Sequence, residues 1–457
     1  MDIFRPAAFP EPITDPDEIQ SRYKYWRVRI FYSIYFGYVF FYFTRKSFTF
    51  AMPMMINDLG FSKADLGILG SILYITYGIS KFISGFLSDQ ANPRYFMATG
   101  LILTGISNLF FGLSSSILYL ALFWGLNGIF QGWGWPPCTK QLTFWFSQKE
   151  RGLWWSIKST SHNVGGALIP LLVAFTGPLL GWRWSMYIPG IISIIMGLWL
   201  LERLRDVPGS LGLPSIETYK GEAEADKPLQ QRDPPEAREL LWSQVLSNGA
   251  VWVLALSYFF VYVVRTGFND WGIVWLNEYK GYSYGEAAGS IAWFEVGGFL
   301  GCIAAGWGSD RFFQGRRVPF MVLCALGLLF AIVGFWFLPA GFLIAENLLM
   351  FIIGFLVFGP QILVGLAAAE FVDKHAACTA NGFAGCFAYI GAASTGYPLG
   401  KVIDIWGWHG FFLALLICSA AIFLILFPLW AFPGRGGGKK IAEPEKVLAV
   451  SPQGSIS

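Results

Sequence analysis

The feature that most constrains this chain is an apolar, aromatic segment that contains an arginine and occurs twice. The first copy reads YVFFYFTR over residues 38–45, and the second reads YFFVYVVR over residues 258–265, an offset of 220 residues. Because successive residues of a helix are about 100° apart, the two tyrosines and the arginine of each copy lie within roughly 60° of one another. The chain therefore contains two copies of one helical unit, each presenting a cation flanked by aromatic side chains.

Composition shows why these arginines are unusual. Of the 457 residues, 55% are hydrophobic and 13% are charged, and the mean hydropathy is +0.52. The apolar runs repeatedly reach the roughly 20 residues that a helix needs to cross about 30 Å of hydrocarbon. A charge in the middle of such a span costs about 3 kcal/mol and normally faces a bundle interior or an aqueous cavity. We therefore predict a polytopic membrane protein in which Arg45 and Arg265 serve function, with a structural ion pair as the alternative.

Twelve hydrophobic segments can be recognised, an even number that keeps both termini on one side. They lie at 29–51, 66–86, 95–113, 117–139, 153–179, 184–203, 250–270, 286–306, 318–338, 342–370, 378–403 and 409–431. Lysine and arginine are concentrated in the loops on the side of the N-terminus, so the positive-inside rule places both termini in the cytoplasm. We expect an all-α membrane protein with two pseudo-symmetric six-helix bundles.

This pattern divides the chain into five parts. They are a cytoplasmic N-terminal segment (1–28), a first six-helix bundle (29–204), a cytoplasmic linker (205–247), a second six-helix bundle (248–432) and a cytoplasmic tail (433–457). The linker and the tail are polar and rich in proline, glycine and lysine. Segments of this composition connect or extend folded domains, so we expect no catalytic role for either.

Motifs for other kinds of chemistry are absent from the sequence. The six cysteines lie in or beside apolar spans without a CxxC pair, so we expect free thiols. The three histidines lack zinc-like spacing, and there is no Walker A loop, nucleophile elbow or HExxH motif. We expect no metal, no cofactor, no nucleic-acid partner and no ATP hydrolysis by this chain.

A second repeat has nearly the same offset as the first. GFLSD over residues 85–89 is followed by Arg94, and GWGSD over residues 306–310 is followed by further arginines. Each copy lies in the cytoplasmic loop after the second span of its half. This pattern resembles the cytoplasmic signature of the major facilitator superfamily, whose fold consists of two six-helix bundles. We expect Asp89 and Asp310 to take part in gating.

Two further cationic side chains lie inside the predicted spans of the first half. Lys81 follows Tyr77 by one turn in the second span, although its long side chain could extend its amine toward the cytoplasm. His162, in the fifth span, is either an anion-binding donor or a histidine that is merely hydrogen-bonded. We favour an anion-binding role for both.

Carboxylates inside the spans of the second half are interpreted as counter-charges. Asp270 follows Arg265 by five positions, and Glu295 lies in the middle of the eighth span. An anion site gains nothing from negative charge beside it, so we expect both to pair with cations such as Lys46 in an ion-pair or gating network. Lys46 is about 100° round the helix from Arg45 and cannot fully share its face.

Two guanidiniums, one from each half, are expected to meet near the middle of the membrane. A guanidinium stays charged when it is desolvated and offers a planar fork that binds phosphate oxygens bidentately. Two of them suit a dianionic phosphoryl group better than a monocarboxylate. Rigid walls and hydroxyl donors are expected from the neighbouring tyrosines Tyr38, Tyr42, Tyr77 and Tyr262.

Several short segments resemble the organophosphate:phosphate antiporter family, most of all its bacterial hexose phosphate branch. They read FTRKSF at 43–48, YGISKF at 77–82, FQGWG at 130–134, SHNVGG at 161–166, YVVR at 262–265, NDWG at 269–272 and FGPQ at 358–361. The run GWGWPPC at 132–138 also resembles the eukaryotic glucose 6-phosphate translocases. The similarity covers nearly all twelve spans.

This resemblance implies a monomeric, multi-pass protein of the bacterial cytoplasmic membrane that exchanges an external sugar phosphate, above all glucose 6-phosphate, for internal inorganic phosphate. The two halves would rock about the site within the lipid bilayer. The implied roles are a phosphate clamp for Arg45 and Arg265, supporting substrate contacts for Lys81 and His162, and a bridging ion-pair network for Lys46, Asp270 and Glu295. The segment 384–399 carries no charge, unlike some hexose phosphate transporters, so the organic substrate stays open.

Two other functional classes are compatible with parts of this pattern. The hexose phosphate branch includes a membrane sensor that detects external sugar phosphate and signals to a histidine kinase, and the same binding site would serve it. A membrane phosphatase would need a nucleophile or a general acid beside the anion, and only His162 is available, without a partner pattern. Nothing in these residues separates transport from sensing, although the absence of an appended signalling domain favours transport. Both are favoured over catalysis, so we do not expect an enzyme.

Overall fold

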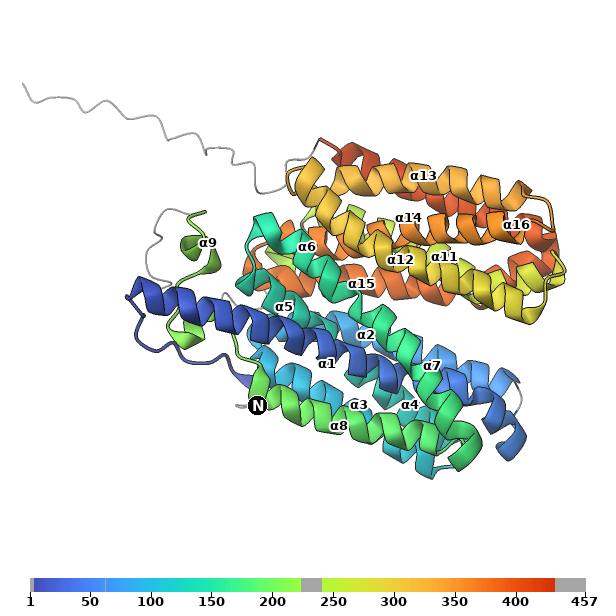
Figure 1. Cartoon of the computed structure of the whole chain (residues 1–457), viewed down its shortest axis with the longest axis horizontal. Coiled ribbons are helices and arrows are strands. Elements are labelled where there is room, and N and C mark those ends of the chain that lie inside the picture. Colours follow the sequence, from blue (N-terminus) through green and yellow to red (C-terminus); the bar gives the residue numbers. More distant parts are fainter. Residues whose placement is uncertain (1–3, 62, 223–240, 432–457) are drawn as a thin grey trace, which may run out of the picture.

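The computed structural model describes residues 4–61, 63–222 and 241–431, which form two helical bundles (Figure 1). The first bundle contains α1 (Pro16–Leu59), α2 (Lys63–Gln90), α3 (Pro93–Leu113), α4 (Ile117–Gln131), α5 (Trp135–Trp145), α6 (Gln148–Ser159), α7 (Ser161–Leu180) and α8 (Trp184–Arg203). The second contains α11 (Gly249–Glu278), α12 (Tyr284–Phe312), α13 (Arg317–Phe337), α14 (Leu343–Glu370), α15 (Ala377–Ser394) and α16 (Tyr397–Leu426). Within the described ranges, eight helices are long and apolar enough to cross a membrane on length and composition alone.

Two spans that the sequence predicts as single helices are each divided in two. The fourth is broken between α4 and α5, where Pro136 and Pro137 occupy the first turn of α5. Proline is tolerated there because the first helical N–H groups have no intrahelical acceptor. The fifth is divided at Thr160, between α6 and α7. When each divided pair is taken together, the described helices give six spans in each bundle.

The last two spans also differ from the expected boundaries. We expected one helix over 378–403, but α15 ends at Ser394 and α16 begins at Tyr397. Pro398 lies in the first turn of α16 and lacks the N–H that a continuous helix would need. The carbonyl oxygen of Thr395 at this break accepts a hydrogen bond of 2.8 Å from the indole of Trp271. A further break inside α16 occurs at Gly407, where φ is 63°.

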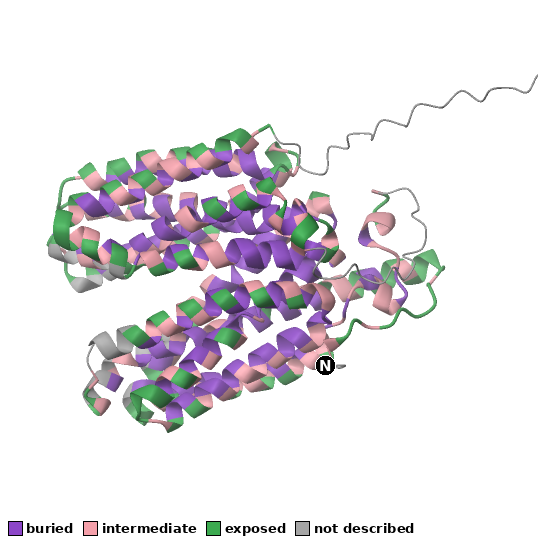
Figure 2. Ribbon diagram, turned by 180° about the vertical axis from the view of Figure 1, so that it is seen from behind, coloured by how far each residue is buried: buried purple, intermediate pink, exposed green. Residues whose placement is uncertain are grey.

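Short elements outside the bundles lie at one end of the molecule, which we call the linker end. They include η2 (Pro208–Leu211), α9 (Ile216–Tyr219), η3 (Leu241–Leu246) and η4 (Lys374–Ala376), whereas η5 (Phe427–Leu429) extends α16. The bundles meet at the linker end and diverge toward the opposite end, and buried residues are concentrated where they meet (Figure 2). Across this junction α2 packs against α15, and α6 packs against α12.

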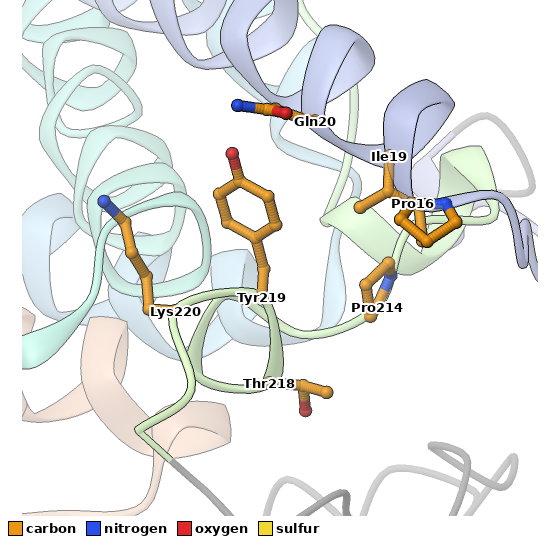
Figure 3. A pocket seen from close by; sticks show the side chains of 7 residues that line it. All are labelled: Pro16, Ile19, Gln20, Pro214, Thr218, Tyr219 and Lys220. Carbon is orange, nitrogen blue, oxygen red and sulfur yellow. The ribbon is translucent and has the colours of Figure 1, made fainter.

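The described part of the linker is folded against the start of α1. Tyr23 of α1 stacks on Tyr219 of α9 with ring centroids 4.2 Å apart, and its hydroxyl donates to the Pro214 carbonyl at 2.5 Å. A shallow pocket lies beside this contact, and the side chain of Tyr219 points across it toward Gln20 of α1 (Figure 3). We had expected the segment before residue 29 to precede the first helix, but α1 begins at Pro16 and extends into the linker end.

One linker carboxylate connects the two bundles. Glu217 of α9 forms an ion pair of 2.5 Å with Lys374 of η4 in the second bundle. The same carboxylate lies 3.9 Å from the guanidinium of Arg151 in α6 of the first bundle. The linker therefore contributes to holding the two halves together at this end. The linker stretch 223–240 and residues 432–457, which include the whole expected tail, lie outside the described residues.

Candidate functional site

Arg45 lies on α1 in the first bundle, and it is 6% exposed. Its Nε and one terminal nitrogen both donate to the Oε1 of Gln131, each at 3.1 Å. Its guanidinium carbon lies 4.5 Å from the ring centroids of Tyr42 and Tyr77 and 5.9 Å from that of Tyr38. Tyr38 and Tyr42, which share its helix face in the sequence, therefore flank this arginine, and Tyr77 of α2 joins them.

A series of buried amides fixes the position of the oxygen that binds Arg45. The Nε2 of Gln131 donates to the hydroxyl of Thr44 at 2.9 Å and to the side-chain oxygen of Asn127 at 3.1 Å. Asn127 in turn donates to Asn108 at 2.8 Å. Because the amide nitrogen of Gln131 is occupied by these acceptors, its oxygen must face the guanidinium. The network thereby orients Arg45 without neutralising it.

Arg265 of α11 occupies the related position in the second bundle and is half-buried. Its guanidinium carbon lies 4.7 Å from the ring centroid of Phe358 and 5.6 Å from that of Tyr262. The carboxylate of Glu295 acts on it electrostatically but lies beyond the 4 Å range of an ion pair. The second copy of the repeat therefore also presents a cation against aromatic faces.

A first chain of rings connects the two arginines. Tyr42, which contacts Arg45, has its ring 5.9 Å from that of His162, and His162 is stacked on Phe358 at 5.9 Å with an interplanar angle of 5°. Phe358 then contacts Arg265. His162 is 6% exposed, and its buried Nε2 has no hydrogen-bond partner among the residues that the structure describes. The imidazole therefore has a free ring nitrogen between the two cations.

A second chain of rings runs along α2, α15 and α11. Tyr77, which contacts Arg45, meets Tyr389 edge to face at 4.3 Å, and Tyr389 lies 5.7 Å from Tyr262, which contacts Arg265. Each chain crosses from one bundle to the other. The two guanidiniums therefore face the same aromatic-lined region between the halves.

Lys81 adds a third cation to this region and is 4% exposed. Its Nζ lies 5.4 Å from the ring centroid of Tyr389 and 5.9 Å from that of Trp135. Gly385 of α15 lies directly against it, since a Cβ there would come within 2.4 Å of Cε and 2.6 Å of Nζ of the lysine. The amine therefore lies between the bundles and does not extend along α2 toward the linker end, which was the alternative left open by the sequence.

The structure separates the residues expected to form a bridging ion-pair network. Lys46 is half-buried on α1 and lies in the electrostatic field of Asp270. No ion pair within 4 Å joins it to Asp270 or Glu295 among the described residues. Instead, Glu295 accepts a hydrogen bond of 3.1 Å from Asn163 of α7. Glu295 therefore bridges the halves in this conformation, but through an amide.

The first copy of the Gly-Asp motif joins the halves at the linker end. A Cβ on Gly85 of α2 would lie 2.5 Å from the carbonyl oxygen of Cys378 in α15, so only glycine permits this approach. Asp89 accepts hydrogen bonds from the backbone N–H groups of Cys378 at 2.9 Å and Thr379 at 2.7 Å, and from the Thr379 hydroxyl at 2.6 Å. A carboxylate at a helix N-terminus is favourable because it satisfies unpaired N–H groups and complements the helix dipole.

The second copy makes a related contact on the other side of the junction. Gly306 of α12 packs against α6 too closely for any side chain. Asp310 accepts from the backbone N–H of Leu153 in α6 at 2.9 Å and contacts the guanidinium of Arg317. Arg317 also donates to Glu370 at 3.0 and 3.1 Å. Both aspartates therefore bind backbone groups of the opposite bundle.

Five residues of this region were not predicted to belong to the site. They are Lys158, Trp135, Tyr389, Phe358 and Gln131. Lys158 carries the same signal as the other intramembrane cations, a lysine in an apolar span, and could have been found by it. The amide and the aromatic residues are common inside helical bundles, so nothing in the sequence separates these from others of their kind.

The arrangement fits an anion that is bound between the two bundles. Cations from both halves converge on one aromatic-lined region, and a free imidazole nitrogen lies among them. Within the described ranges no group of three or more histidine, cysteine, aspartate or glutamate residues is placed to hold a metal ion. The pocket beside α9 contains one cation, Lys220, and lacks such convergence.

Comparisons with known proteins find relatives that cover most of this chain. A family model described as Major Facilitator Superfamily matches residues 34–396. A probable hexose phosphate transport protein of Chlamydia muridarum (strain MoPn / Nigg) is 56% identical over 444 residues, which cover 94% of this chain and 96% of that protein. The membrane sensor protein UhpC of Escherichia coli (strain K12) is 45% identical over 416 residues, which cover 91% and 95%. The structure of the proton:xylose symporter XylE bound to 6-bromo-6-deoxy-D-glucose matches with a TM-score of 0.69 at 14% identity, covering 90% of this chain and 96% of that one.

Proposed function

Because the chain belongs to the Major Facilitator Superfamily, in its organophosphate:phosphate antiporter branch, we propose that it exchanges a sugar phosphate for inorganic phosphate across a bacterial cytoplasmic membrane. The expected fold of two six-helix bundles is confirmed by the family and by the structural match. Membership of a transporter family also agrees with the expectation that the chain is not an enzyme.

The observation that supports this proposal is the convergence of Arg45 and Arg265 from opposite bundles on one region. A phosphoryl group with two negative charges can accept bidentate hydrogen bonds from both guanidiniums at once. It would then be attracted to both halves, and its charge would offset theirs. Glucose 6-phosphate and inorganic phosphate share this group, so one site can hold either ligand in turn.

The contacts at the linker end support alternating access as the mechanism. Asp89 and Asp310 hold α15 and α6 closed there, and we assign this end to the cytoplasm because it carries the linker. Breaking these contacts would open the site to the cytoplasm. An empty site that holds several unpaired cations should reorient slowly, which couples the movement of one ligand to the return of another.

Exchange in liposomes tests the proposal. Purified protein in phosphate-loaded liposomes should take up labelled glucose 6-phosphate, whereas phosphate-free liposomes should take up much less. Equal uptake in both would contradict antiport. The sequence of the sensor protein UhpC is also similar to this chain, so sensing is the second candidate. Binding of glucose 6-phosphate without any exchange would favour it.

A further inference from the structure

Lys158, in the last turn of α6, is fully buried beneath the site just described. Its Nζ lies 3.5 Å from the ring centroid of Trp135 and 3.9 Å from that of Tyr38. Among the described residues no oxygen accepts a hydrogen bond from this nitrogen, and the thiol of Cys138 is the polar group beside it. Two aromatic faces therefore stabilise the ammonium, but no acceptor oxygen does.

Two other buried lysines show what a structural role looks like in this protein. Lys280 forms an ion pair of 3.0 Å with Glu346. Lys140 lies 3.5 Å from the carboxylate of Asp206 and donates to the carbonyl oxygen of Ala91 at 2.7 Å. Each has both a counter-ion and an acceptor oxygen. Lys158 has neither within the described residues, although a buried ammonium without them is costly.

The two rings that cover Lys158 also face the other cations of the first bundle. Tyr38 contacts both Lys158 and Arg45, whose guanidinium carbon is 5.9 Å from its ring centroid. Trp135 contacts both Lys158 and Lys81, whose Nζ is 5.9 Å from its ring centroid. Two aromatic rings are therefore shared by three cations. No carboxylate in the described ranges forms an ion pair with any of the three.

We propose that Lys158 is a specificity-determining residue that makes the site select doubly charged phosphate esters over singly charged esters of the same shape. The inference rests on the proposed function and concerns the same site. Lys158 does not touch the substrate, because Tyr38 and Trp135 cover it. Its charge acts through these rings, where little water is present to screen it, and Coulomb attraction rises in proportion to the charge of the ligand.

The size of the effect follows from Coulomb's law. At a separation on the order of 10 Å and an effective dielectric constant of about 20, one ammonium raises the affinity of a ligand roughly tenfold for each negative charge on that ligand. The affinity of a dianion is therefore raised by the square of the factor for a monoanion. Removal of the Lys158 charge should therefore weaken a dianionic ester about tenfold more than a monoanionic ester.

Glucose 6-phosphate and glucose 6-sulfate are the appropriate probes. Both carry a tetrahedral ester on the same sugar, but at pH 7 the phosphate is mostly a dianion and the sulfate is a monoanion, since the second pKa of a phosphate ester is about 6. Binding of each is measured by calorimetry on the full-length protein, as wild type, Lys158→Met and Lys158→Arg. Lys149→Met is the matched control, because that side chain is 80% exposed on the same helix.

We expect the preference for phosphate over sulfate to fall by about tenfold in Lys158→Met and to be retained in Lys158→Arg and in Lys149→Met. If Lys158→Met is not monodisperse, Lys158→Gln supplies a second neutral side chain. An unchanged preference in the neutral variant would overturn the inference. Equal weakening of both ligands would also overturn it, since that result indicates a purely structural role. Failure of the wild type to bind either ester would instead count against the proposed function.

Discussion

Removal of the Asp89 side chain should release the linker end of the molecule. In the closed junction this carboxylate accepts three hydrogen bonds from the start of α15: two from backbone N–H groups and one from the Thr379 hydroxyl. Replacement of a side chain that caps a helix N-terminus costs about 1 to 2 kcal/mol, and loss of a negative charge there costs about 0.5 kcal/mol more. For Asp89→Ala we therefore expect the closed state to be destabilised by about 2 kcal/mol relative to the open state. This corresponds to a roughly 30-fold increase in the population of the open state.

The chain contains its own reporter for this equilibrium. Cys378 is fully buried at the junction, and its Sγ lies 3.1 Å from the carbonyl oxygen of Pro136 in the opposite bundle. In a variant that keeps Cys378 and replaces the other five of the six cysteines with alanine, maleimide should react only when the junction opens. Asp89→Ala should then raise the labelling rate by about 30-fold, since the rate follows the open population.

A second buried thiol gives the matched control. Cys324 of α13 lies inside the second bundle, away from the junction, and should stay protected in Asp89→Ala when it is the cysteine retained. Rapid labelling of both thiols would show that the variant is unfolded. An unchanged labelling rate of Cys378 in a variant that still binds ligand would refute the view that Asp89 holds the junction closed.

Two further predictions concern charges elsewhere in the molecule. Lys46→Ala and Asp270→Asn should each slow phosphate exchange in liposomes, and the double variant should lose less than the sum, because Lys46 lies in the field of Asp270. The effects of Lys46→Ala and Glu295→Gln on the exchange rate should be additive in the double variant. Non-additive effects for Lys46 with Glu295, but not for Lys46 with Asp270, would contradict the arrangement seen here. Glu217→Gln should raise the labelling rate of Cys378 only a few-fold, because partly exposed ion pairs contribute about 0.5 to 1 kcal/mol. No increase would show that the linker does not stabilise the junction.

The sequence was sufficient to predict those parts of the fold that depend on the thickness of the membrane and on the internal duplication. Bilayer thickness fixes the length of a span, and the two copies of the repeat place Arg45 and Arg265 in equivalent helices of two confirmed bundles. The helix break before Trp135, inside the span predicted over 117–139, was not expected, since paired prolines do not reveal whether the chain bends or begins a new helix. These features depend on local sequence.

Features that depend on contacts between the bundles could not be predicted from sequence alone. Asp89 binds backbone groups 289 and 290 positions away, and no sequence pattern identifies which helix end a carboxylate will cap. Lys158 had a sequence signal that was overlooked. The rings that cover it, from α1 and α5, could be identified only in the folded chain.

The central claim is that Arg45 and Arg265 hold one phosphoryl group that both exchanged ligands share. Calorimetric binding of glucose 6-phosphate and of inorganic phosphate to the wild type, Arg45→Lys and Arg265→Lys tests it most directly. A lysine keeps the charge but cannot reproduce the bidentate fork, so each variant should bind both ligands at least about tenfold more weakly. Near-normal binding of either ligand by either variant would contradict the claim.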